Sequence, residues 1–301
     1  VQTCALPIWD GTLRGLKVAL IDKGDFGAAT SAATSKLIHG GLRYLKTLEV
    51  GLVRESLQER RIMEVIAPHL VYPLPFVFPA YGWGMRGMPA AVSAMVFYDT
   101  LSYDRKWIND DDKKIPGHEK FSAEQIIRLE PILDPADLKG GVIYYDCQMY
   151  NPERLTLEPI LSAVEYGADA ANYLMAGDLL VEGDTVVGAR VRDLMDKDRE
   201  YDIKAAVTVN AAGPWADTIL GRIRGRKHHG LIRSKGIHII TRPLYKDHAM
   251  VLQTKSGRHF FIIPWRGSSL IGTTDVVYKG DPDDFRVTEA DINDFLDEIN
   301  V

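Results

Sequence analysis

Hydrophobic residues along the chain form two kinds of pattern, and the first of them predicts a strand. Val18 to Asp22 (V-A-L-I-D) is an almost unbroken apolar run that closes on an acidic residue. Such a run, ended by a polar loop, is typical of a strand buried in a parallel sheet. Leu52 to Ile66 instead mixes apolar residues with arginines and glutamates at helical spacing, and Pro68 ends the pattern. It predicts an amphipathic helix.

A change of composition after this helix marks the entry into a second domain. From Tyr72 to Trp107 the chain is rich in proline and aromatic residues, and the charged segment Asn109 to Lys120 predicts a solvated loop. The elements expected here and just beyond are a strand at Phe76 to Phe78, helices at Pro89 to Leu101 and Pro152 to Tyr166, and a small strand near Asn172 to Met175.

Short apolar runs separated by turn residues dominate the second half of the chain. They predict a meander at Leu179 to Val181, Val186 to Arg192 and Tyr201 to Ala205, a strand returning to the first sheet at Ala206 to Ala211, and four strands at Ile237 to Thr241, Met250 to Leu252, His259 to Ile263 and Ser269 to Thr273. The simplest arrangement is an α/β chain in which a nucleotide-binding domain is interrupted twice by a substrate domain built on an antiparallel sheet. We place the first at residues 10–71 and 151–232, and the second at 72–150 and 233–301.

The two ends of the sequence predict an internal fragment. A dinucleotide domain normally opens with a strand that runs into a glycine-rich turn, whose amides hold the pyrophosphate. Only Gly11 and Gly15 precede Val18, so we expect this turn to be missing. Thr288 to Val301 predicts a helix with a T-x-x-D cap. Its apolar stripe has nothing downstream to pack against and consists of Ile292, Phe295, Leu296 and Ile299.

Composition and charge narrow the classes of function. With 301 residues and 46% hydrophobic content the chain is long enough to bury a large core, and a net charge of −5 gives no electrostatic reason to expect nucleic acid. Cys4 and Cys147 form neither a disulfide framework nor a metal-ligand pattern, so we expect no metal and a reducing, cytoplasmic compartment. No run of about 18 apolar residues predicts a spanning helix, and no secretion signal opens the chain.

A loop of small polar residues after the first strand is the main candidate for cofactor binding. Asp22 closes the strand, where a carboxylate suits a pair of ribose hydroxyls, and small residues downstream let the backbone approach a flat ring. The alternatives are a plain strand-end acid and a flexible serine-rich linker. Strand and loop together indicate a flavin dinucleotide. The loop residues that carry this interpretation are Thr30, Ser31, Ser35, Lys36, His39, Gly40 and Gly41.

The motif V-N-A-A-G-P-W, from Val209 to Trp215, places small residues where a returning strand would pass beneath a dinucleotide. We therefore expect Ala211, Ala212 and Gly213 to contact the cofactor. The same motif also suits tight strand-to-helix packing, with Pro214 in the first helical turn. The two interpretations are compatible.

Motifs in a fixed order carry a family resemblance over almost the whole chain from Asp10 onward. They are R-G-L-K-V-A-L-I-D-K-G-D-F at Arg14 to Phe26, A-T-S-A-A-T-S-K-L-I-H-G-G-L-R-Y-L at Ala29 to Leu45, A-P-H-L at Ala67 to Leu70, Y-Y-D at Tyr144 to Asp146, V-N-A-A-G-P-W, K-G-I-H at Lys235 to His238, I-P-W at Ile263 to Trp265, I-G-T-T-D at Ile271 to Asp275 and K-G-D-P at Lys279 to Pro282. In these segments the chain resembles the FAD-dependent glycerol-3-phosphate dehydrogenase family.

The resemblance implies a two-domain, D-amino-acid-oxidase-like fold with FAD as cofactor. It implies oxidation of sn-glycerol 3-phosphate to dihydroxyacetone phosphate, with hydride passing from C2 to flavin N5 and electrons passing on to membrane quinone. It further implies peripheral attachment to the inner face of the plasma membrane. The apolar helix around Met85 to Leu101 is then either a buried helix or a surface that dips into the bilayer. A homodimer is left open.

The resemblance also assigns roles to single residues. Arg43 and Tyr44 match residues that face the substrate phosphate, and His238 is the best candidate for the base. Taken alone, an arginine and a tyrosine at a helix start are usually surface or packing residues, and a lone strand histidine is usually a core residue. Thr274 lines the substrate cavity or makes a strand-end turn. We interpret Asp146 and Arg154 as structural. The residues expected to contact FAD are Asp22, Lys23, Thr30, Ser31, Ser35, Lys36, Leu37, His39, Gly40, Gly41, Ala211, Ala212 and Gly213.

Other functions stay open at this point. A glycerol-3-phosphate oxidase differs only in its electron acceptor, and an amine-oxidising flavoenzyme would have no need of Arg43 for phosphate. A flavin-free, inactive fragment is the third alternative, because the glycine-rich turn is missing. We expect residues 1 to 301 alone to bind FAD weakly or not at all and to show no dehydrogenase activity.

Overall fold

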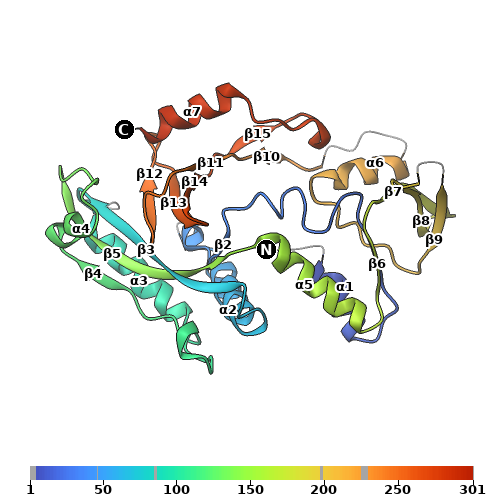
Figure 1. Ribbon diagram of the computed structural model, residues 1–301, viewed down its shortest axis with the longest axis horizontal. Helices are drawn as coiled ribbons and strands as arrows, with labels where there is room; N and C mark the ends of the chain where they lie inside the picture. The colour runs from blue at the N-terminus through green and yellow to red at the C-terminus, as the bar shows by residue number, and fades with distance from the viewer. Residues whose placement is uncertain (1–4, 46, 85–86, 197–198, 225–229, 301) are drawn as a thin grey trace. The chain divides into compact units, whose positions relative to one another are not determined.

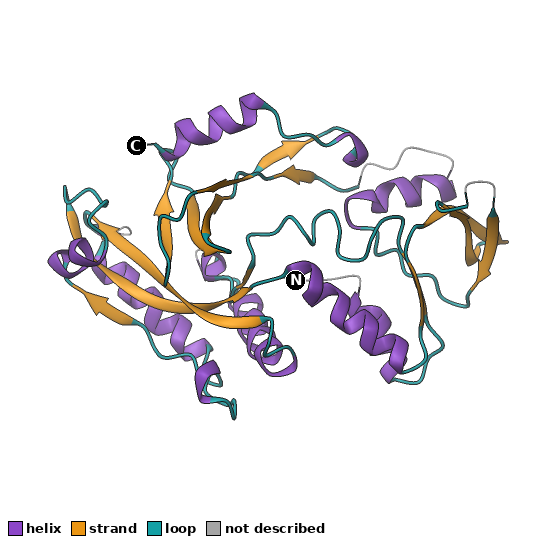
Figure 2. Cartoon of the chain, viewed as in Figure 1, coloured by secondary structure: helices purple, strands orange, loops and turns teal. Residues whose placement is uncertain are grey.

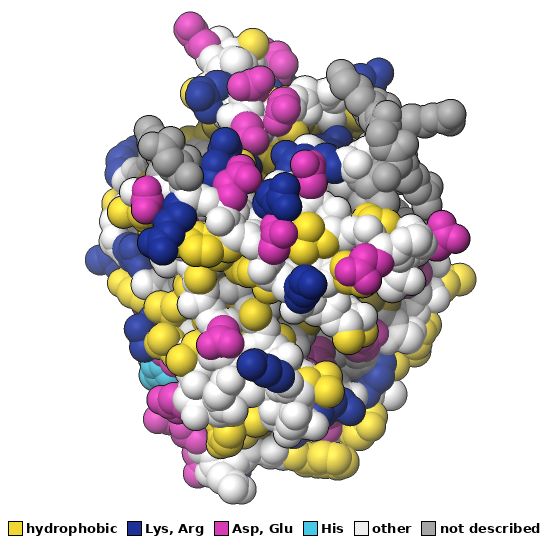
Figure 3. Space-filling view, turned by 90° about the vertical axis from the view of Figure 1, so that its right-hand side faces the viewer, with side chains coloured by type: hydrophobic (Ala, Val, Ile, Leu, Met, Phe, Trp, Pro, Cys, Tyr) yellow, Lys and Arg dark blue, Asp and Glu magenta, His cyan; other side chains and the backbone are white. Residues whose placement is uncertain are grey.

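The computed structural model describes residues 5–45, 47–84, 87–196, 199–224 and 230–300, and helices and strands alternate along most of this length (Figures 1 and 2). The chain divides into two compact units. The first unit consists of Val1–Thr34, Asn151–Lys235 and Val276–Arg286, and the second of Ser35–Tyr150, Gly236–Asp275 and Val287–Val301. Acidic and basic side chains are interspersed on the face shown in Figure 3.

The first unit is built around a short parallel strand pair. Strand β1 (Ala19–Ile21) pairs in parallel with β6 (Asp169–Ala171), as the apolar run predicts. Two helices, α1 (Ala5–Leu13) and α5 (Pro152–Glu165), pack against each other beside this pair, and Trp9 Nε1 donates to Ser162 Oγ over 3.0 Å. The predicted burial of β1 is only partial, because Ala19 is exposed and the next two residues are half-buried in a sheet of two strands.

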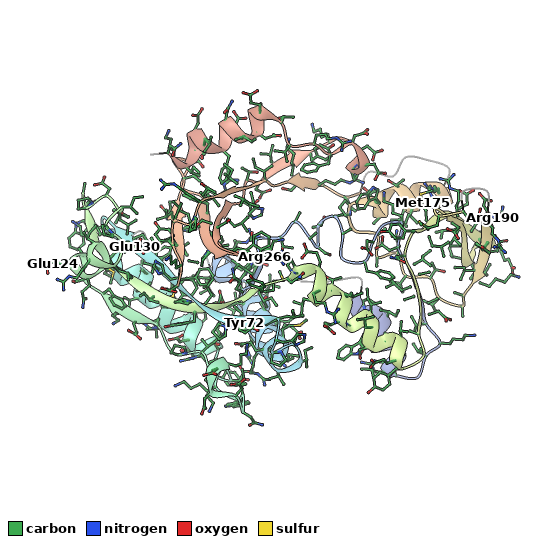
Figure 4. All side chains as sticks on the ribbon, in the orientation of Figure 1. Tyr72, Glu124, Glu130, Met175, Arg190 and Arg266 are labelled. Carbon is green, nitrogen blue, oxygen red and sulfur yellow. The ribbon has the colours of Figure 1, made fainter. Side chains whose placement is uncertain are left out.

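An antiparallel meander completes most of the first unit and confirms the three strands expected there. Its order is β7-β8-β9, and Arg190 Nε in β8 donates to Asp202 Oδ1 in β9 over 2.8 Å (Figure 4). The remaining elements are the 3₁₀ helices η4 (Gly213–Trp215) and η5 (Pro282–Asp284), helix α6 (Ala216–Arg224) and the antiparallel pair β10 (Arg233–Lys235) and β15 (Val276–Tyr278). The meander strands are Leu174–Glu182, Thr185–Asp193 and Glu200–Lys204.

The strand expected at Ala206 to Ala211 is absent from the described structure. Its valines, Val207 and Val209, are 77% and 67% exposed, so nothing in the structure covers them. Asn210 instead organises a turn into the following helix, because its side-chain amide donates to Ala216 O over 3.0 Å and its side-chain oxygen accepts from the amide of Ala212. The local hydrogen bonds of an asparagine side chain compete here with strand formation.

The second unit contains one large mixed sheet. The strand order is β11-β14-β13-β12-β3-β5-β2, and β4 also pairs with β5. All neighbouring strands are antiparallel except β12 and β3. The strands are β2 (Leu37–Ile38), β3 (Val71–Tyr81), β4 (Glu119–Phe121), β5 (Leu138–Met149), β11 (His238–Thr241), β12 (Ala249–Gln253), β13 (His259–Trp265) and β14 (Ser268–Gly272).

Helices cover both faces of this sheet. Helices α2 (Val50–Ile66) and α3 (Met88–Leu101) pack on one face, where the core contains Leu57, Phe76, Tyr98, Tyr144 and Ile263. The other face carries α4 (Ala123–Leu129) and α7 (Glu289–Ile299), and its core contains Val77, Ile126, Met250, Phe260 and Ile262. Consecutive strand residues belong to opposite cores because side chains alternate across a sheet.

Helix α7 confirms the predicted cap and corrects the prediction about its apolar stripe. Thr288 Oγ1 accepts from the amide of Asp291, and Asp291 Oδ2 accepts from the amide of Thr288 over 2.8 Å. Phe295 is 1% exposed and packs edge-on against Phe260, with 6.4 Å between ring centres, and Ile299 contacts the same core. The partner of the stripe is thus strand β13, far upstream in the sequence, while Ile292 and Leu296 stay 39% and 36% exposed.

The boundaries of the units differ from the predicted domain limits. Residues 35–71 belong to the second unit rather than to the first, because β2 pairs with β5 and α2 packs on the same sheet. Residues 276–286 return to the first unit because β15 pairs with β10.

The segment Asn109 to Lys120 is more ordered than the predicted solvated loop. It contains the 3₁₀ helix η3 (Asp111–Lys113), and Lys113 is buried, with its ammonium donating to Val71 O over 2.6 Å. This charge-rich segment thus contributes one buried lysine, which packs against strand β3 of the second unit. Of the two cysteines, Cys147 is a buried free thiol and Cys4 lies outside the described residues.

Candidate functional site

In the first unit, Asp22 lies at the carboxyl end of β1. Its side-chain Oδ1 accepts from the amide of Gly24 over 2.9 Å, and its backbone carbonyl accepts from the amide of Leu174. A carboxylate held by a turn at the end of a parallel strand fits the ribose hydroxyls of a dinucleotide. The neighbouring Lys23 contacts two other parts of the unit, the carboxylate of Asp283 at 2.5 Å and the ring of Trp215 at 4.0 Å.

The loop after Asp22 packs against the start of helix α5. Gly27 has a φ of +80°, and a Cβ there would lie 3.1 Å from the carbonyl oxygen of Glu153. Thr30 and Ser31 lie in the turns that follow, with Thr30 exposed and Ser31 half-buried. The loop is therefore shaped by close backbone contact with the helix and is not a free linker.

Ala211, Ala212 and Gly213 form a turn rather than the predicted floor strand. Gly213 has a φ of +49° and begins η4, and the amide of Trp215 donates to Ala212 O over 3.0 Å. The indole N–H of Trp215 is buried and has no hydrogen-bond partner among the described residues. A buried donor of this kind calls for an acceptor from a ligand or a water molecule.

In the second unit, the segment Ser35 to Gly41 lies along the edge of the large sheet. Leu37 and the next residue pair with β5, and Lys36 O accepts from the amide of Met149 over 2.9 Å. Lys36 is buried in a left-handed conformation with a φ of +59°, and its ammonium lies 5.1 Å from the centre of the Trp265 ring. Strand pairing and this cation–π contact together hold the segment in place.

His238 begins strand β11, at the other end of the strand order from β2, and contacts Ser35. Its Nε2 lies 2.9 Å from Ser35 Oγ, although 203 positions separate the two residues in the sequence. Burial, together with the nearby charge of Lys36, lowers the pKa of His238 to about 4, so the imidazole is neutral at pH 7. It is therefore in the form that accepts a proton, but it is a weaker base than the near-neutral histidine expected from the sequence.

The end of strand β14 supports His238. The backbone of Gly272 faces the imidazole so closely that a Cβ there would lie 2.2 Å from the ring. Thr274 Oγ1 accepts from the amide of Ile237 over 2.9 Å. Thr274 thus makes the strand-end contact that was one of its two predicted roles, and it fixes the residue that precedes the histidine.

Arg43 and Tyr44 lie in the 3₁₀ helix η1 (Leu42–Leu45) and contact each other. Arg43 Nη2 donates to the phenol oxygen of Tyr44 over 2.8 Å, and its guanidinium lies 4.8 Å from the centre of the tyrosine ring. Gly41, with a φ of +71°, makes room for this ring, because a Cβ would lie 2.8 Å from it. Arg43 is exposed and remains accessible to an anion.

The two glycines and His39 form the turn before this pair. The amide of Gly41 donates to His39 Nδ1 over 3.0 Å, so the neutral ring carries its proton on Nε2. The side chain of His39 keeps accessible surface, yet the pKa of its imidazole is lowered, chiefly because surrounding protein replaces part of its hydration and also because of Arg43; Asp146 acts in the opposite direction.

The structure groups the predicted residues by unit. The first unit holds the residues proposed for the dinucleotide up to Ser31, together with 211–213. The second unit holds Ser35 to Gly41, Arg43, Tyr44, His238 and Thr274. Sequence reasoning did not identify the Trp265 contact or the hydrogen bond from the Gly40 amide to Asp146, at 3.0 Å. The motifs I-P-W and Y-Y-D were the available signals for both.

Neither a metal-ligand cluster nor a membrane-spanning helix is found in the part of the chain that the structure describes. Within those residues, no group of three or more histidine, cysteine, aspartate or glutamate side chains could hold a metal ion. No described helix is both long and apolar enough to cross a bilayer.

Comparison with known proteins agrees with the fold and with these motifs. The chain is 37% identical over 303 residues to a glycerol-3-phosphate dehydrogenase of Synechocystis sp., covering 97% of this chain and 53% of that protein. It is 33% identical over 299 residues to an alpha-glycerophosphate oxidase of Streptococcus pyogenes, covering 95% and 47%. The structure matches that of the glycerol-3-phosphate dehydrogenase from Bacillus halodurans complexed with FAD, with a TM-score of 0.74, 30% identity and coverage of 98% and 50%.

The chain spans about half the length of these relatives. A model of the FAD dependent oxidoreductase family matches residues 5–300. This match and the structural similarity confirm the predicted α/β fold class, with its FAD-binding and antiparallel-sheet parts. The chain belongs to the FAD dependent oxidoreductase family.

Proposed function

We propose that this protein oxidises sn-glycerol 3-phosphate to dihydroxyacetone phosphate with FAD as its cofactor. The observation that carries the proposal is the placement, within one unit, of an accessible Arg43–Tyr44 pair and a neutral His238 on the same sheet as the Ser35 to Gly41 segment. The similarity to glycerol-3-phosphate dehydrogenases over 97% of the chain supports it.

Arg43 and Tyr44 would bind the phosphate of the substrate. A guanidinium binds two phosphate oxygens at once, and its planar shape favours this paired contact. Because Tyr44 accepts a hydrogen bond from Arg43, the phenol proton stays available to a third phosphate oxygen. The contact also holds the guanidinium in place before substrate arrives, which lowers the entropy cost of binding.

His238 would take the proton of the C2 hydroxyl. Its neutral imidazole has one nitrogen able to accept that proton, and the bond to Ser35 fixes the ring orientation. When bound, FAD supplies the acceptor for the hydride that leaves C2. Within the first unit, the proposed residues from Asp22 to Ser31 and at 211–213 suit a ribose and a pyrophosphate by chemical type, and within the second unit those from Ser35 to Gly41 suit a flavin ring edge.

We further propose that electrons pass to a membrane quinone and that the protein attaches peripherally to the inner face of the plasma membrane. The support is helix α3, which buries Ala91, Met95 and Tyr98 but leaves Val96 51% and Phe97 42% exposed. Apolar side chains at a helix surface favour contact with a bilayer. Homodimer formation stays a prediction without a supporting contact.

An oxidase is the second candidate, and the similarity to an alpha-glycerophosphate oxidase favours it. The two functions share the substrate and differ in the electron acceptor. Purified protein, reduced by glycerol 3-phosphate, should pass its electrons to a soluble quinone and form little peroxide. Peroxide formation at the rate of substrate oxidation would identify the oxidase, and reduction by glycine or sarcosine alone would identify an amine oxidase.

Arg43 gives the sharpest test of the substrate. In the full-length protein, Arg43→Ala should weaken glycerol 3-phosphate binding by about 2 to 4 kcal/mol while FAD content stays the same, because a paired, charge-assisted contact is lost. The measurement is the dependence of flavin reduction on substrate concentration. Arg266→Ala is the matched control, since Arg266 is also exposed and stacks on a ring, that of Trp265 at 4.7 Å (Figure 4). Equal effects of both substitutions would overturn the phosphate assignment.

A further inference from the structure

A buried carboxylate lies directly behind the Gly40 turn. Asp146 is 2% exposed and accepts from three groups: the amide of Gly40 at 3.0 Å, the phenol of Tyr98 at 2.8 and 3.0 Å, and the guanidinium of Arg60. These donors come from the turn, from α3 and from α2, whereas Asp146 itself lies in β5. One carboxylate thus connects the turn to three elements of the sheet and its helices.

The turn fits against this group with no spare space. A Cβ on Gly40 would lie 2.2 Å from both the Tyr98 phenol oxygen and a methyl carbon of Leu57, so only glycine permits the contact. On the other side of the turn, the amide of Gly41 donates to His39 Nδ1. The Gly40 amide is therefore fixed in direction, and with it the backbone of His39 and Gly41.

Arg60 holds the carboxylate from behind. It is 1% exposed, and beyond Asp146 it donates to Tyr145 O at 3.2 Å and Ser102 Oγ at 3.0 Å. A buried ion pair is a costly way to gain stability, because the desolvation of both charges offsets most of their attraction. Because this ion pair lies behind a turn that only glycine fits, its main role is to fix the geometry of the turn rather than to add stability.

The second unit contains a comparable ion pair that lacks this contact. Asp104 is 2% exposed and accepts from Arg54 at 2.8 Å and from Arg61 at 3.0 Å. Both of these arginines lie on α2, and neither belongs to Ser35 to Gly41. The two aspartates therefore separate the effect of a buried ion pair from the effect of contact with the turn.

We propose that Asp146, supported by Arg60 and Tyr98, is a positioning residue that fixes the His39 to Gly41 backbone for contact with the flavin. The inference rests on the proposed function, since it takes this segment as the ring-edge contact. Asp146 touches neither substrate nor cofactor and acts only through the Gly40 amide. Loss of the network would leave the turn in place but free to change the direction of its amides.

The test compares Asp146→Asn, Tyr98→Phe and the control Asp104→Asn in the full-length protein. Asparagine at 146 places an amide N–H₂ against the donors of Arg60 and Tyr98, and phenylalanine at 98 removes one donor while keeping the ring and the ion pair. Two measurements are made: hydrogen exchange of the peptide covering Leu37 to Leu42 without FAD, and the visible spectrum and reduction rate of the flavin at equal FAD occupancy.

In Asp146→Asn we expect faster hydrogen exchange at Gly40, a shifted flavin absorption band and flavin reduction slowed about 10- to 100-fold. Tyr98→Phe should show smaller changes of the same kind. In Asp104→Asn the exchange and reduction rates should change by less than about twofold. The inference is overturned if both network variants match the control. If Asp146→Asn does not fold, Tyr98→Phe decides. If glycerol 3-phosphate fails to reduce the wild-type flavin, the proposed function fails, whereas the exchange measurement without FAD still decides the positioning.

Discussion

Among single residues, a second buried carboxyl group stands beside the Arg60–Asp146 pair. Glu64 is 1% exposed, and neither of its carboxyl oxygens has a hydrogen-bond partner among the described residues. Burial raises the pKa of Glu64 to about 7, against the opposing effect of Arg60 on the same helix. Asp146 and Cys147 face it from β5 and Lys113 from η3; Lys113 and the thiol of Cys147 favour the ionised form, whereas Asp146 opposes it.

Glu64 should therefore make stability depend on pH. Between its usual pKa of 4.5 and the folded value of about 7, the folded state keeps a proton that the unfolded chain has released, so stability falls as pH rises through this window. The total loss is about 3 kcal/mol. Glu64→Gln keeps the neutral shape, and urea denaturation should show it gaining about that much relative to wild type between about pH 4 and about pH 8.

The histidines of the site act with the opposite sign. The pKa of His238 is lowered to about 4 and that of His39 is also lowered, so both favour the folded state more as pH rises from the folded value toward the usual 6.5. In wild type this gain masks part of the loss from Glu64. The free energy of unfolding of Glu64→Gln should accordingly rise with pH over this range. If wild type and variant show the same pH dependence, Glu64 is ionised in the folded protein.

His238 has a catalytic prediction of its own. His238→Ala should slow flavin reduction by glycerol 3-phosphate about 100-fold or more in a stopped-flow experiment, because the proposed acceptor of the hydroxyl proton is lost. FAD content should not change. His259→Ala is the control, since His259 is another half-buried strand histidine of the same unit, hydrogen-bonded to Gln253. A full-speed reaction in His238→Ala would assign the base role elsewhere.

Residue types were predictable from the sequence, whereas their neighbours were not. Asp22, Ser35 and His238 could be singled out because their chemistry and motifs are local. The contact between Ser35 and His238 spans 203 positions, and that between Gly40 and Asp146 spans 106, so no periodic pattern signals either one. The lowered pKa of His238 likewise depends on burial, which the strand pattern leaves open.

At the scale of elements, prolines explain why strand β3 was underestimated. The sequence predicts only Phe76 to Phe78, yet the strand runs over Val71–Tyr81. Pro73, Pro75 and Pro79 have no N–H to donate, which normally argues against an interior strand. The sheet accommodates them because the neighbouring β12 pairs only with Phe76 and Val77, between the prolines. The amphipathic helices, in contrast, were predicted within a few residues, since their period is local.

Helix α7 should depend on one side chain. Phe295→Ala removes a ring that is 1% exposed and packed on Phe260, and it should lower the free energy of unfolding by about 3 to 5 kcal/mol. Leu296→Ala, the next residue and 36% exposed, is the control and should cost far less. Chemical denaturation of both variants measures the difference. Equal small effects would show that α7 contributes little to the core.

For the whole molecule, the sequence predicted two interleaved parts but misplaced their limits. The first predicted limit followed a change of composition at Tyr72, whereas the unit changes at Ser35. The two strand residues of β2 are too few to leave a pattern, yet their pairing with β5 decides the unit to which the segment belongs. The boundaries of such units are determined by contacts between residues, and the amino-acid composition indicates them only indirectly.

Truncation should reveal how the large sheet is completed. A chain ending at Lys235 lacks β11 to β14 and exposes the edge of β3, so we expect it to be insoluble. A chain ending at Arg286 keeps every strand of that sheet and lacks α7, and it should stay more soluble. The soluble fraction after expression measures both. Equal solubility would show that β3 and β5 form a stable unit without β12.

The single parallel pairing in the large sheet also determines how long the edge of β3 stays unpaired during translation. Strands β3 and β5 leave the ribosome first, but β12, which covers the edge of β3 at Phe76 and Val77, follows only after the whole middle of the chain. At about 5 to 20 residues per second this interval lasts about 5 to 20 seconds. Throughout it the nascent chain carries an uncovered apolar strand, so in the cell the yield of folded protein should depend on chaperones that shield this edge while translation continues.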